Sequence, residues 1–472
     1  MNHKFLLSIL AVASASVLLG KDINLEQHVK KYWTVYQGKK IEVGNGDKRW
    51  PVTPALKAER QKHYNECLRR FAPHQLQEAY RIDKIFGWKR GTYLGILRFG
   101  LKKEDKAAPK KNPAHECTSW LVMDNLTDGK SIILHKNRES RKQVLTLQRR
   151  AMPGKHAWIG NGSCHSFYPT QGMNDRGMVV LMNSGDPLAE NDNSQYGLGT
   201  PVICRILLEE CGTAKEAVEM LEKIICANAY THVESGSIWF IGDAKDVYII
   251  ENSARKCVAK RVDSGFIARG NSFHYPEMQI YSLNKFKTLV DLSRREFTVR
   301  NYLINKQWRE NGIITPLDIA ASSRINVVED APKCYPPSGR ATISSTTFVI
   351  DKEFPETLST MYLTLSSPNS SCYLPVPLTL QDVPEKILNG SYSARSLELF
   401  NKKQPLLPEK ILAELEKRLY GRHAAAMEKA RKLLRTGKGH SLRTDVAKIL
   451  NDTFRENFND IQNTVKKHGT KK

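Results

Sequence analysis

Cys117 has the residue type and the surroundings of a catalytic nucleophile. It opens the run CTSWLVM at residues 117–123, whose composition is typical of a strand. The loose, basic stretch before it, LKKEDKAAPKKNPAHE at residues 101–116, indicates an exposed linker. A cysteine where a domain begins, so far into the chain, predicts a cut between Glu116 and Cys117. The cut would give Cys117 both a thiol and a free α-amine.

A predicted hairpin brings charged residues to this thiol. Two apolar strands flank the turn signal TDGK at residues 127–130. If the turn centres on this motif, strand pairing places Arg138 opposite Cys117, within the uncertainty of the turn register. The neighbouring Lys136 and Glu139 are then also brought to Cys117. A cation near a thiol favours the thiolate, and a carboxylate can hold an ammonium group in place.

The α-amine released by such a cut can act as the base for its own thiol. An α-amine has a pKa near 8, so its proton can move either way at working pH. The mechanism therefore needs no histidine, and His115, His156 and His165 are interpreted as surface or loop residues.

Four parts of the chain surround and include this hairpin. Residues 1–20 have a lysine followed by a short apolar stretch, typical of a secretory signal peptide. Residues 21–116 form a charged, helical pro-segment that ends in the basic linker. Residues 117–380 are strand-rich with inserted helices and predict an α+β body with layered sheets. Residues 381–472 are basic, and their apolar stripes predict a packed helical extension.

Several elements of the α+β body can be located from the apolar pattern. Strands are predicted over residues 178–183, 238–241, 247–250, 346–350 and 361–365, and a helical pattern extends over residues 201–225.

Composition narrows the class of partner. The formal net charge of +23 favours anionic surfaces, and 40% hydrophobic residues are enough for a sizeable core. Lysine and arginine are spread along the whole chain, without zinc-finger spacing or an RNA-recognition signature. We therefore expect no nucleic-acid partner, and attraction to anionic envelope polymers is the simpler interpretation of the charge.

The nine cysteines do not suggest a metal site. Their odd number leaves at least one thiol unpaired if the rest form disulfides, and the lack of a CxxC pair argues against a zinc or thioredoxin-type site. The chemistry considered for Cys117 implies no metal or organic cofactor. Cys204, Cys211 and Cys226 fall in helical patterns and are predicted to fill the core. Cys164 is the rival nucleophile, but its neighbour His165 is adjacent in sequence rather than demonstrably in space.

Several motifs share their order with a known group of enzymes. They are CTS at 117–119, DGK at 128–130, KNRE at 136–139, GMNDRGM at 172–178, the helical pattern at 199–225, GD at 242–243 with IE at 250–251, and GNSF at 270–273. In this order they resemble N-terminal nucleophile (Ntn) hydrolases with a cysteine nucleophile, in particular choloylglycine hydrolases, penicillin-V amidases, penicillin-forming acyltransferases and related dipeptidases. The resemblance covers residues 117–380 and implies a four-layer αββα fold, self-cleavage before the nucleophile and action on a linear amide.

The resemblance assigns roles to three residues of the hairpin. Cys117 is the implied nucleophile, Lys136 stands where the family has an arginine beside the thiol, and Glu139 stands where an aspartate orients the amine. Lysine lacks the fork of arginine and glutamate reaches one methylene further than aspartate. Glu116 also stands where a small residue is common. Because of these departures, the alternative is an inactive member of the family. In that case Cys117 would be a buried structural thiol, and Lys136 and Glu139 would lie at a solvated strand end.

Three residues outside the hairpin complete the implied site. Asn183 would offer its backbone N–H, and Asn271 its side-chain amide, to the oxyanion of a tetrahedral intermediate. Lys285 matches a later family arginine. Each of the three also has a structural alternative. Asn183 precedes the turn-forming run SGDP and Asn271 follows a glycine, so both could be turn residues. Lys285 could be a surface residue of a helix.

Three functions follow from these interpretations. The first is an exported, self-processing amidohydrolase or acyltransferase acting on small amides, such as N-acyl amino acids, bile-salt-like conjugates or β-lactam side chains. The second is a dipeptidase of the same superfamily, which acts on short peptides and holds the substrate by its free amine. The third is a binding protein that keeps the fold and holds anionic envelope polymers. The oligomeric state stays open.

Overall fold

The strands of the computed structural model form two large sheets that face each other. The described residues are 22–38, 41–44, 53–101, 117–140, 143–188, 196–232, 235–283, 293–310, 312–325, 337–338, 342–402, 405–437 and 442–469. Within them, one sheet has the order β12 (Phe266–Arg269), β1 (Cys117–Val122), β2 (Ser131–Glu139), β13 (Thr342–Asp351), β14 (Thr360–Thr364) and β15 (Leu374–Pro377). The other has the order β11 (Cys257–Arg261), β10 (Val247–Asn252), β9 (Ser235–Gly242), β6 (Val179–Pro187), β5 (Pro169–Asn174), β4 (Trp158–Ser163) and β3 (Leu145–Arg150). A short parallel pair joins β7 (Leu198–Gly199) to β8 (Tyr230–Thr231).

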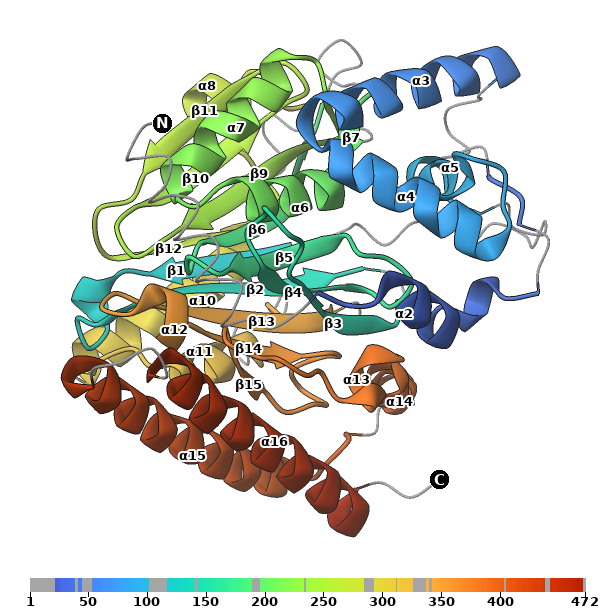
Figure 1. The fold of residues 1–472 in the computed structure, drawn as a ribbon. Coiled ribbons are helices and arrows are strands. Elements are labelled where there is room, and N and C mark those ends of the chain that lie inside the picture. The colour runs from blue at the N-terminus through green and yellow to red at the C-terminus, as the bar shows by residue number, and fades with distance from the viewer. Residues whose placement is uncertain are drawn as a thin grey trace.

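Helices cover the outer faces of both sheets. Helices α6 (Thr200–Glu210) and α7 (Ala214–Cys226) pack on the sheet that contains β6. Helices α10 (Ser293–Arg309), α11 (Pro316–Ser323), α15 (Glu409–Thr436) and α16 (Leu442–His468) pack on the sheet that contains β1. Figure 1 shows the four layers from top to bottom. This arrangement is the αββα fold that the resemblance implied, and it confirms the predicted fold class.

Both faces of β1 and β2 pack against a hydrophobic core, and strand alternation decides which face carries the thiol of Cys117. Leu121 and Leu134 face the second sheet and belong to the core between the sheets, whereas Trp120 and Ile133 face α10 and α11. Since side chains alternate along a strand, Cys117 lies on the same face as Leu121. The thiol therefore points into the space between the two sheets.

The predicted elements of the body are present, with one difference. The helical pattern at residues 201–225 is two helices, because α6 ends at Glu210 and α7 begins at Ala214, with Gly212 between them. Thr213 and Glu216 form a capping box at the start of α7, which fixes the break between the helices. Cys204 and Cys211 are buried as predicted, but Cys226, on the last turn of α7, is exposed, so the prediction of a core position was wrong for this residue.

The motif GMNDRGM forms a tight turn between β5 and β6 rather than part of the site. Asn174 accepts hydrogen bonds from the backbone N–H groups of Arg176 and Met178 at 3.1 Å each. Gly177 has a φ of +75°, and a Cβ there would lie 2.8 Å from the carbonyl oxygen of Pro355. Only glycine fits this backbone without strain, so the motif is explained by the turn.

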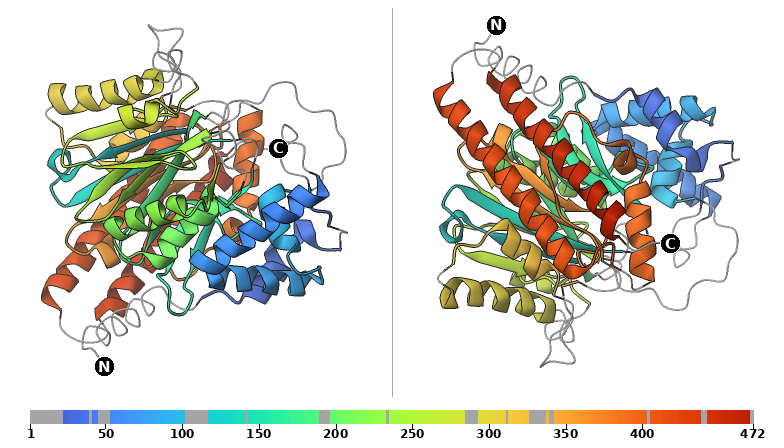
Figure 2. Two further views of the ribbon diagram at one scale, coloured as in Figure 1. Left: turned by 90° about the horizontal axis from the view of Figure 1, so that it is seen from above. Right: turned by 90° about the horizontal axis from the view of Figure 1, so that it is seen from below.

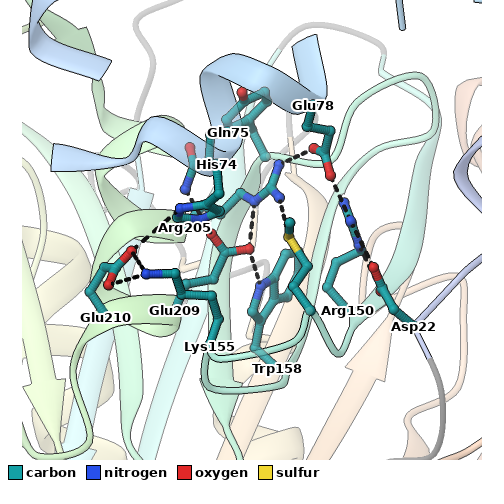
Figure 3. Close-up of polar contacts among 12 residues, drawn as sticks. Asp22, His74, Gln75, Glu78, Arg150, Lys155, Trp158, Arg205, Glu209 and Glu210 are labelled. Atoms are coloured by element: carbon teal, nitrogen blue, oxygen red, sulfur yellow. Dashed lines mark hydrogen bonds and ion pairs between the residues drawn. The ribbon is translucent and has the colours of Figure 1, made fainter. Parts of the chain in front are cut away.

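The N-terminal helices share a core with the body. They are α2 (Leu25–Tyr32), α3 (Pro54–Phe71), α4 (Pro73–Phe86) and α5 (Thr92–Phe99). Buried Trp33, Leu68 and Leu76 belong to the same hydrophobic cluster as Trp158 of β4 and Ile206 of α6. Figure 1 places these helices beside α6, and Figure 3 shows the buried charged residues at this contact. The N-terminal helices are thus packed against the α+β body.

Four further helices lie in connections: α8 (Pro276–Gln279) follows β12, α12 (Pro355–Leu358) joins β13 to β14, and α13 (Glu385–Leu388) and α14 (Ser391–Asn401) follow β15 and contact β3. Seen from below, α15 and α16 lie side by side across the sheet (Figure 2, right). Leu415 and Phe458 from this pair belong to the main core cluster, as expected for a packed extension. Among the described helices, none is both long and apolar enough to cross a membrane.

Candidate active site

The hairpin places Arg138 directly opposite Cys117, as the turn signal predicts. Cys117 and Arg138 are Cα partners in the antiparallel pairing of β1 with β2. The side chains of directly opposed residues lie on the same face of a sheet. Cys117 is 6% exposed, so its thiol lies in a nearly closed space beside the guanidinium of Arg138.

Lys136 is the second cation at this thiol. It is two residues from Arg138 on β2, it is buried, and its side chain interacts with the thiol of Cys117. Its Nζ also donates a hydrogen bond to the carbonyl oxygen of Met182 on the facing sheet. Burial lowers the pKa of Lys136 and also that of Arg138, and in each case the interaction with Cys117 opposes the change. Two desolvated cations stabilise the thiolate form of a neighbouring cysteine.

Asn271 holds the backbone nitrogen of Cys117. This N–H donates to Asn271 Oδ1 at 2.8 Å, and the same oxygen accepts from Nη2 of Arg295 at 3.0 Å. The amide Nδ2 of Asn271 donates to the carbonyl oxygen of Ser184 at 2.7 Å. An amide nitrogen carries two hydrogens, so this bond leaves one donor of Asn271 for the predicted contact with an oxyanion.

Glu139 lies on the other face of β2, next to α10. Its Oε2 is 3.8 Å from Nη1 of Arg295, and both side chains are buried. Arg295 therefore contacts both Glu139 and Asn271 from the outer face of the sheet.

Asn183 is a strand residue whose side chain connects the two sheets. It pairs with Ile238 in the β6–β9 ladder, so the turn alternative does not describe it. Its Oδ1 accepts from the hydroxyl of Ser119 at 2.7 Å, and its Nδ2 donates to the carbonyl oxygen of Gly270 at 3.0 Å. Ser119 lies two residues after Cys117 on the same face of β1, so Asn183 is brought to the neighbourhood of the thiol. Lys285 and Glu116 lie outside the described residues.

Arg295 is the residue that sequence analysis missed. The sequence does contain a signal, because Arg295, Val299 and Leu303 recur at four-residue spacing and lie on one buried face of α10. A lone arginine in a row of apolar residues indicates a buried charge with a partner. The partners Asn271 and Glu139 are far away in sequence, so only the fold identifies them.

Replacing Arg295 with methionine is expected to lower the rate of amide turnover about 100-fold, because Asn271 loses the cation that fixes its carbonyl oxygen. Arg295→Lys should recover part of this loss, since it keeps the charge without the fork. The matched control is Arg300→Met, an exposed position on the same helix. Rate constants, compared with thermal midpoints for all three variants, check the prediction. Equal rates for Arg295→Met and Arg300→Met would contradict it.

Buried polar groups support β2 from behind the site. His135 Nδ1 lies 2.7 Å from the hydroxyl of Thr347, and the His135 ring packs at a tilt against Trp120 with the centroids 4.0 Å apart. Asn137 donates to the carbonyl oxygens of Ser323 and Pro337 at 2.9 and 2.8 Å. These contacts fix the strand that carries Lys136 and Arg138.

Buried histidines predict a loss of stability at acidic pH. Burial lowers the pKa to about 3 for His135 and to about 4 for His28 and His423. An unfolded histidine titrates near 6.5, so below that pH the unfolded chain binds protons that the folded chain excludes, and stability falls from about pH 6.5 towards pH 4. Each buried histidine should contribute about 2 kcal/mol of loss at pH 5. Asp186, whose pKa burial raises to about 6, acts in the opposite sense, because its folded form gains a proton as the pH falls through 6.

Urea denaturation at pH 7 and pH 5 measures this effect. The wild type should lose several kcal/mol between the two values. His135→Gln and His423→Gln should each flatten the pH dependence, whatever they cost at pH 7. A pH dependence that neither substitution changes would contradict the assignment to these histidines.

The rival nucleophile Cys164 has the opposite electrostatics. Burial raises the pKa of its thiol to about 11, which favours the neutral form. His165 does lie 3.2 Å from its sulfur, but burial lowers the pKa of that histidine as well. Neither residue is therefore charged at neutral pH, and no described cation shifts the pKa of Cys164. Within the described part of the chain, no cluster of three or more His, Cys, Asp or Glu residues could hold a metal ion.

Comparison with known proteins agrees with the motifs. Residues 133–310 match the family model of acyl-coenzyme A:6-aminopenicillanic acid acyl-transferase, from β2 to the end of α10. No curated protein sequence matches the chain. The family match confirms the resemblance to penicillin acyltransferases that the motifs predicted, over a segment that contains Lys136, Glu139, Asn183, Asn271 and Arg295.

Solved structures of three amide hydrolases show partial likeness. A mutant of conjugated bile acid hydrolase from Clostridium perfringens is 11% identical, covers 57% of this chain and 95% of its own, and has a TM-score of 0.36. Penicillin V acylase from Agrobacterium tumefaciens is 16% identical over 56% of this chain and 86% of its own, with a TM-score of 0.34. An N-acylethanolamine-hydrolyzing acid amidase ortholog from Caenorhabditis elegans is 14% identical over 49% of this chain and 92% of its own, with a TM-score of 0.33.

Proposed function

We propose that this protein is an exported cysteine amidohydrolase or acyltransferase that acts on linear amide bonds through Cys117. The observation that carries the proposal is the surroundings of Cys117. Its backbone nitrogen is held by Asn271, and its thiol faces two cations, the buried Lys136 and the half-buried Arg138. The family match over residues 133–310 supports the same reaction class.

Activation requires that the peptide bond between Glu116 and Cys117 breaks. The freed α-amine would remain against Asn271 Oδ1, which already accepts from this nitrogen at 2.8 Å. The amine takes the thiol proton, and Lys136 and Arg138 stabilise the thiolate. Base and nucleophile then belong to one residue.

The thiolate attacks the carbonyl carbon of the substrate amide and forms a tetrahedral intermediate. Donors proposed for its oxyanion are the backbone N–H of Asn183 and the second amide hydrogen of Asn271. The leaving amine takes the proton held by the α-ammonium, and an acyl-thioester on Cys117 remains. Water attacks the thioester to release the acid and restore the thiol, while attack by an amine would complete acyl transfer.

Export and maturation belong to the same proposal. The sequence of residues 1–20 supports removal of a signal peptide, and the basic linker before Cys117 supports a second cut. A protein of net charge +23 would also be attracted to anionic envelope polymers.

The intact masses of the purified protein under denaturing conditions test the proposal. Two fragments that meet between Glu116 and Cys117 are expected, together with thioester labelling of Cys117 by an acylating probe. A single uncut chain that also stays unlabelled after trimming to start at Cys117 would overturn it and would favour the binding-protein alternative.

A further inference from the structure

The segment that carries Asn271 is irregular backbone held in place by side chains. Residues 270–275, between β12 and α8, belong to no helix or strand, and all of them except His274 are buried. Their backbone N–H groups therefore have no helical or ladder partners, and a buried donor without a partner is costly. The groups that accept these hydrogen bonds also fix the position of Asn271.

Glu251 of β10 holds the end of this segment. Its two carboxylate oxygens accept from the backbone N–H groups of His274 and Tyr275, at 2.8 and 3.0 Å. The side chain is fully buried. Burial raises the pKa of this carboxyl, against the effect of the two hydrogen bonds. These contacts give a structural role to the motif IE at residues 250–251, which the proposed mechanism does not use.

Two further carboxylates hold the rest of the segment. Glu296 of α10 accepts from the N–H of Gly270 at 2.6 Å, and Asp186 of β6 accepts from the N–H of Phe273 at 2.8 Å. Both side chains are 3% exposed. His274 interacts with this group, since its Nε2 lies 3.2 Å from a carboxylate oxygen of Glu296. Carboxylates from β6, β10 and α10, which are distant in the sequence, thus meet at one short segment.

The energetic cost of this arrangement points to a role in the site. Burying a charged carboxylate costs more free energy than burying an uncharged acceptor. In return, hydrogen bonds to a charged acceptor are short and strong. Here the strong bonds flank Asn271, whose Oδ1 accepts from the N–H of Cys117 at 2.8 Å. An error of about 1 Å in the placement of a group at a reacting centre can cost about 100-fold in rate.

We propose that these three carboxylates are positioning residues for the reaction at Cys117. By fixing the backbone on both sides of Asn271, they keep its Oδ1 on the nitrogen of Cys117 and its amide at the oxyanion. They act through Asn271 and not on the substrate. The inference rests on the proposed function, because it adds residues to that same site.

Glu251→Gln and a matched control separate positioning from stability. Glutamine has one acceptor oxygen in place of two, and its NH₂ group would face one of the N–H donors. The control is Asp83→Asn, because Asp83 of α4 is also buried and accepts from the backbone N–H groups of Gly91 and Tyr93 at 2.6 and 2.7 Å. Both variants should have a lower thermal midpoint. Only Glu251→Gln should lower kcat for hexanoyl-p-nitroanilide, by about 10- to 100-fold, with KM changed less than about 3-fold.

Hydrogen exchange measures the same position without turnover. The full-length Cys117→Ala chain retains the backbone N–H that donates to Asn271. Mass spectrometry of peptides that span residues 115–123 should show about 10-fold faster exchange of this N–H when Glu251→Gln is added, and no change when Asp83→Asn is added. If Glu251→Gln does not fold, Glu296→Ala is the milder variant. It removes one accepted hydrogen bond and should show both effects at smaller size.

The outcomes separate this inference from the proposed function. Equal kcat in Glu251→Gln and Asp83→Asn, or unchanged exchange of the N–H at residue 117, would overturn the positioning role. Turnover by the cut wild type would in that case leave the Cys117 chemistry standing. Conversely, an exchange effect confined to Glu251→Gln, in a protein that is neither cut nor active, would uphold the positioning of Asn271 and overturn the enzyme.

Discussion

Replacing Cys117 with alanine is expected to leave the chain uncut before this residue and to lower amide turnover by at least about 10⁴-fold. The substitution removes the atom that would attack both the Glu116–Cys117 peptide bond and the substrate. It changes the fold little, because the side chain is small and the strand is held by its pairing with β2. Intact mass and initial rates measure the two effects on one preparation.

Cys164→Ala is the matched control for this substitution. Cys164 is also buried, and it has a histidine beside its sulfur, so it is the cysteine that a sequence reader could mistake for the nucleophile. Since burial raises the pKa of its thiol to about 11, Cys164→Ala should be cut and active like the wild type. Loss of activity in Cys164→Ala together with normal cutting in Cys117→Ala would reverse the assignment.

Cys117→Ser separates the two steps further. Serine retains a nucleophilic atom, but the nearby cations Lys136 and Arg138 cannot shift a hydroxyl far enough to ionise it at neutral pH. Slow cutting with little turnover is therefore expected. Equal rates for cysteine and serine would show that the thiolate does not matter.

The hairpin could be predicted from sequence because its geometry is local. A turn signal fixes the register, and the register alone puts Arg138 opposite Cys117. Asn183 and Asn271 could be predicted only from the resemblance to a known family. Their distances from Cys117 depend on how the two sheets face each other, which local sequence patterns do not determine. The same limit applies to Arg295, which reaches Asn271 and Glu139 only after α10 packs on the sheet.

The contact of the N-terminal helices with the body could not be predicted from sequence either. The helices themselves could be predicted from composition, but the partners of their charges lie over a hundred residues away. Glu78 of α4 lies between Arg205 of α6 and Arg150 of β3, with N–O distances of 2.6 Å to each (Figure 3). Burial alone would raise the pKa of Glu78, but the two arginines lower it to about 2.

A second carboxylate extends this buried network. Glu209 accepts from Arg205 at 2.8 Å, from Gln75 at 2.8 Å and from the indole of Trp158 at 3.1 Å, and His74 lies 2.7 Å away (Figure 3). The carboxylates and cations alternate across the contact between α4 and α6. Each buried charge therefore has a partner of opposite sign, which is the condition for such a network to be stable.

Replacing Glu78 with alanine is expected to lower the free energy of unfolding by about 3–5 kcal/mol, because it leaves Arg150 and Arg205 buried with less compensation. Urea denaturation in the uncut Cys117→Ala background measures this, since the chain then unfolds as one molecule. The matched control is Glu398→Ala, which removes two surface ion pairs, with Arg395 and Lys402, and should leave the midpoint within error. The charge balance at Glu78 also predicts that Glu78→Gln is intermediate, because the amide keeps one acceptor for the two guanidinium groups. Equal shifts of the midpoint in Glu78→Ala and Glu398→Ala would contradict the prediction. The N-terminal helices would then be held to the body by the shared apolar core around Trp33 and Trp158 and not by the buried charge network.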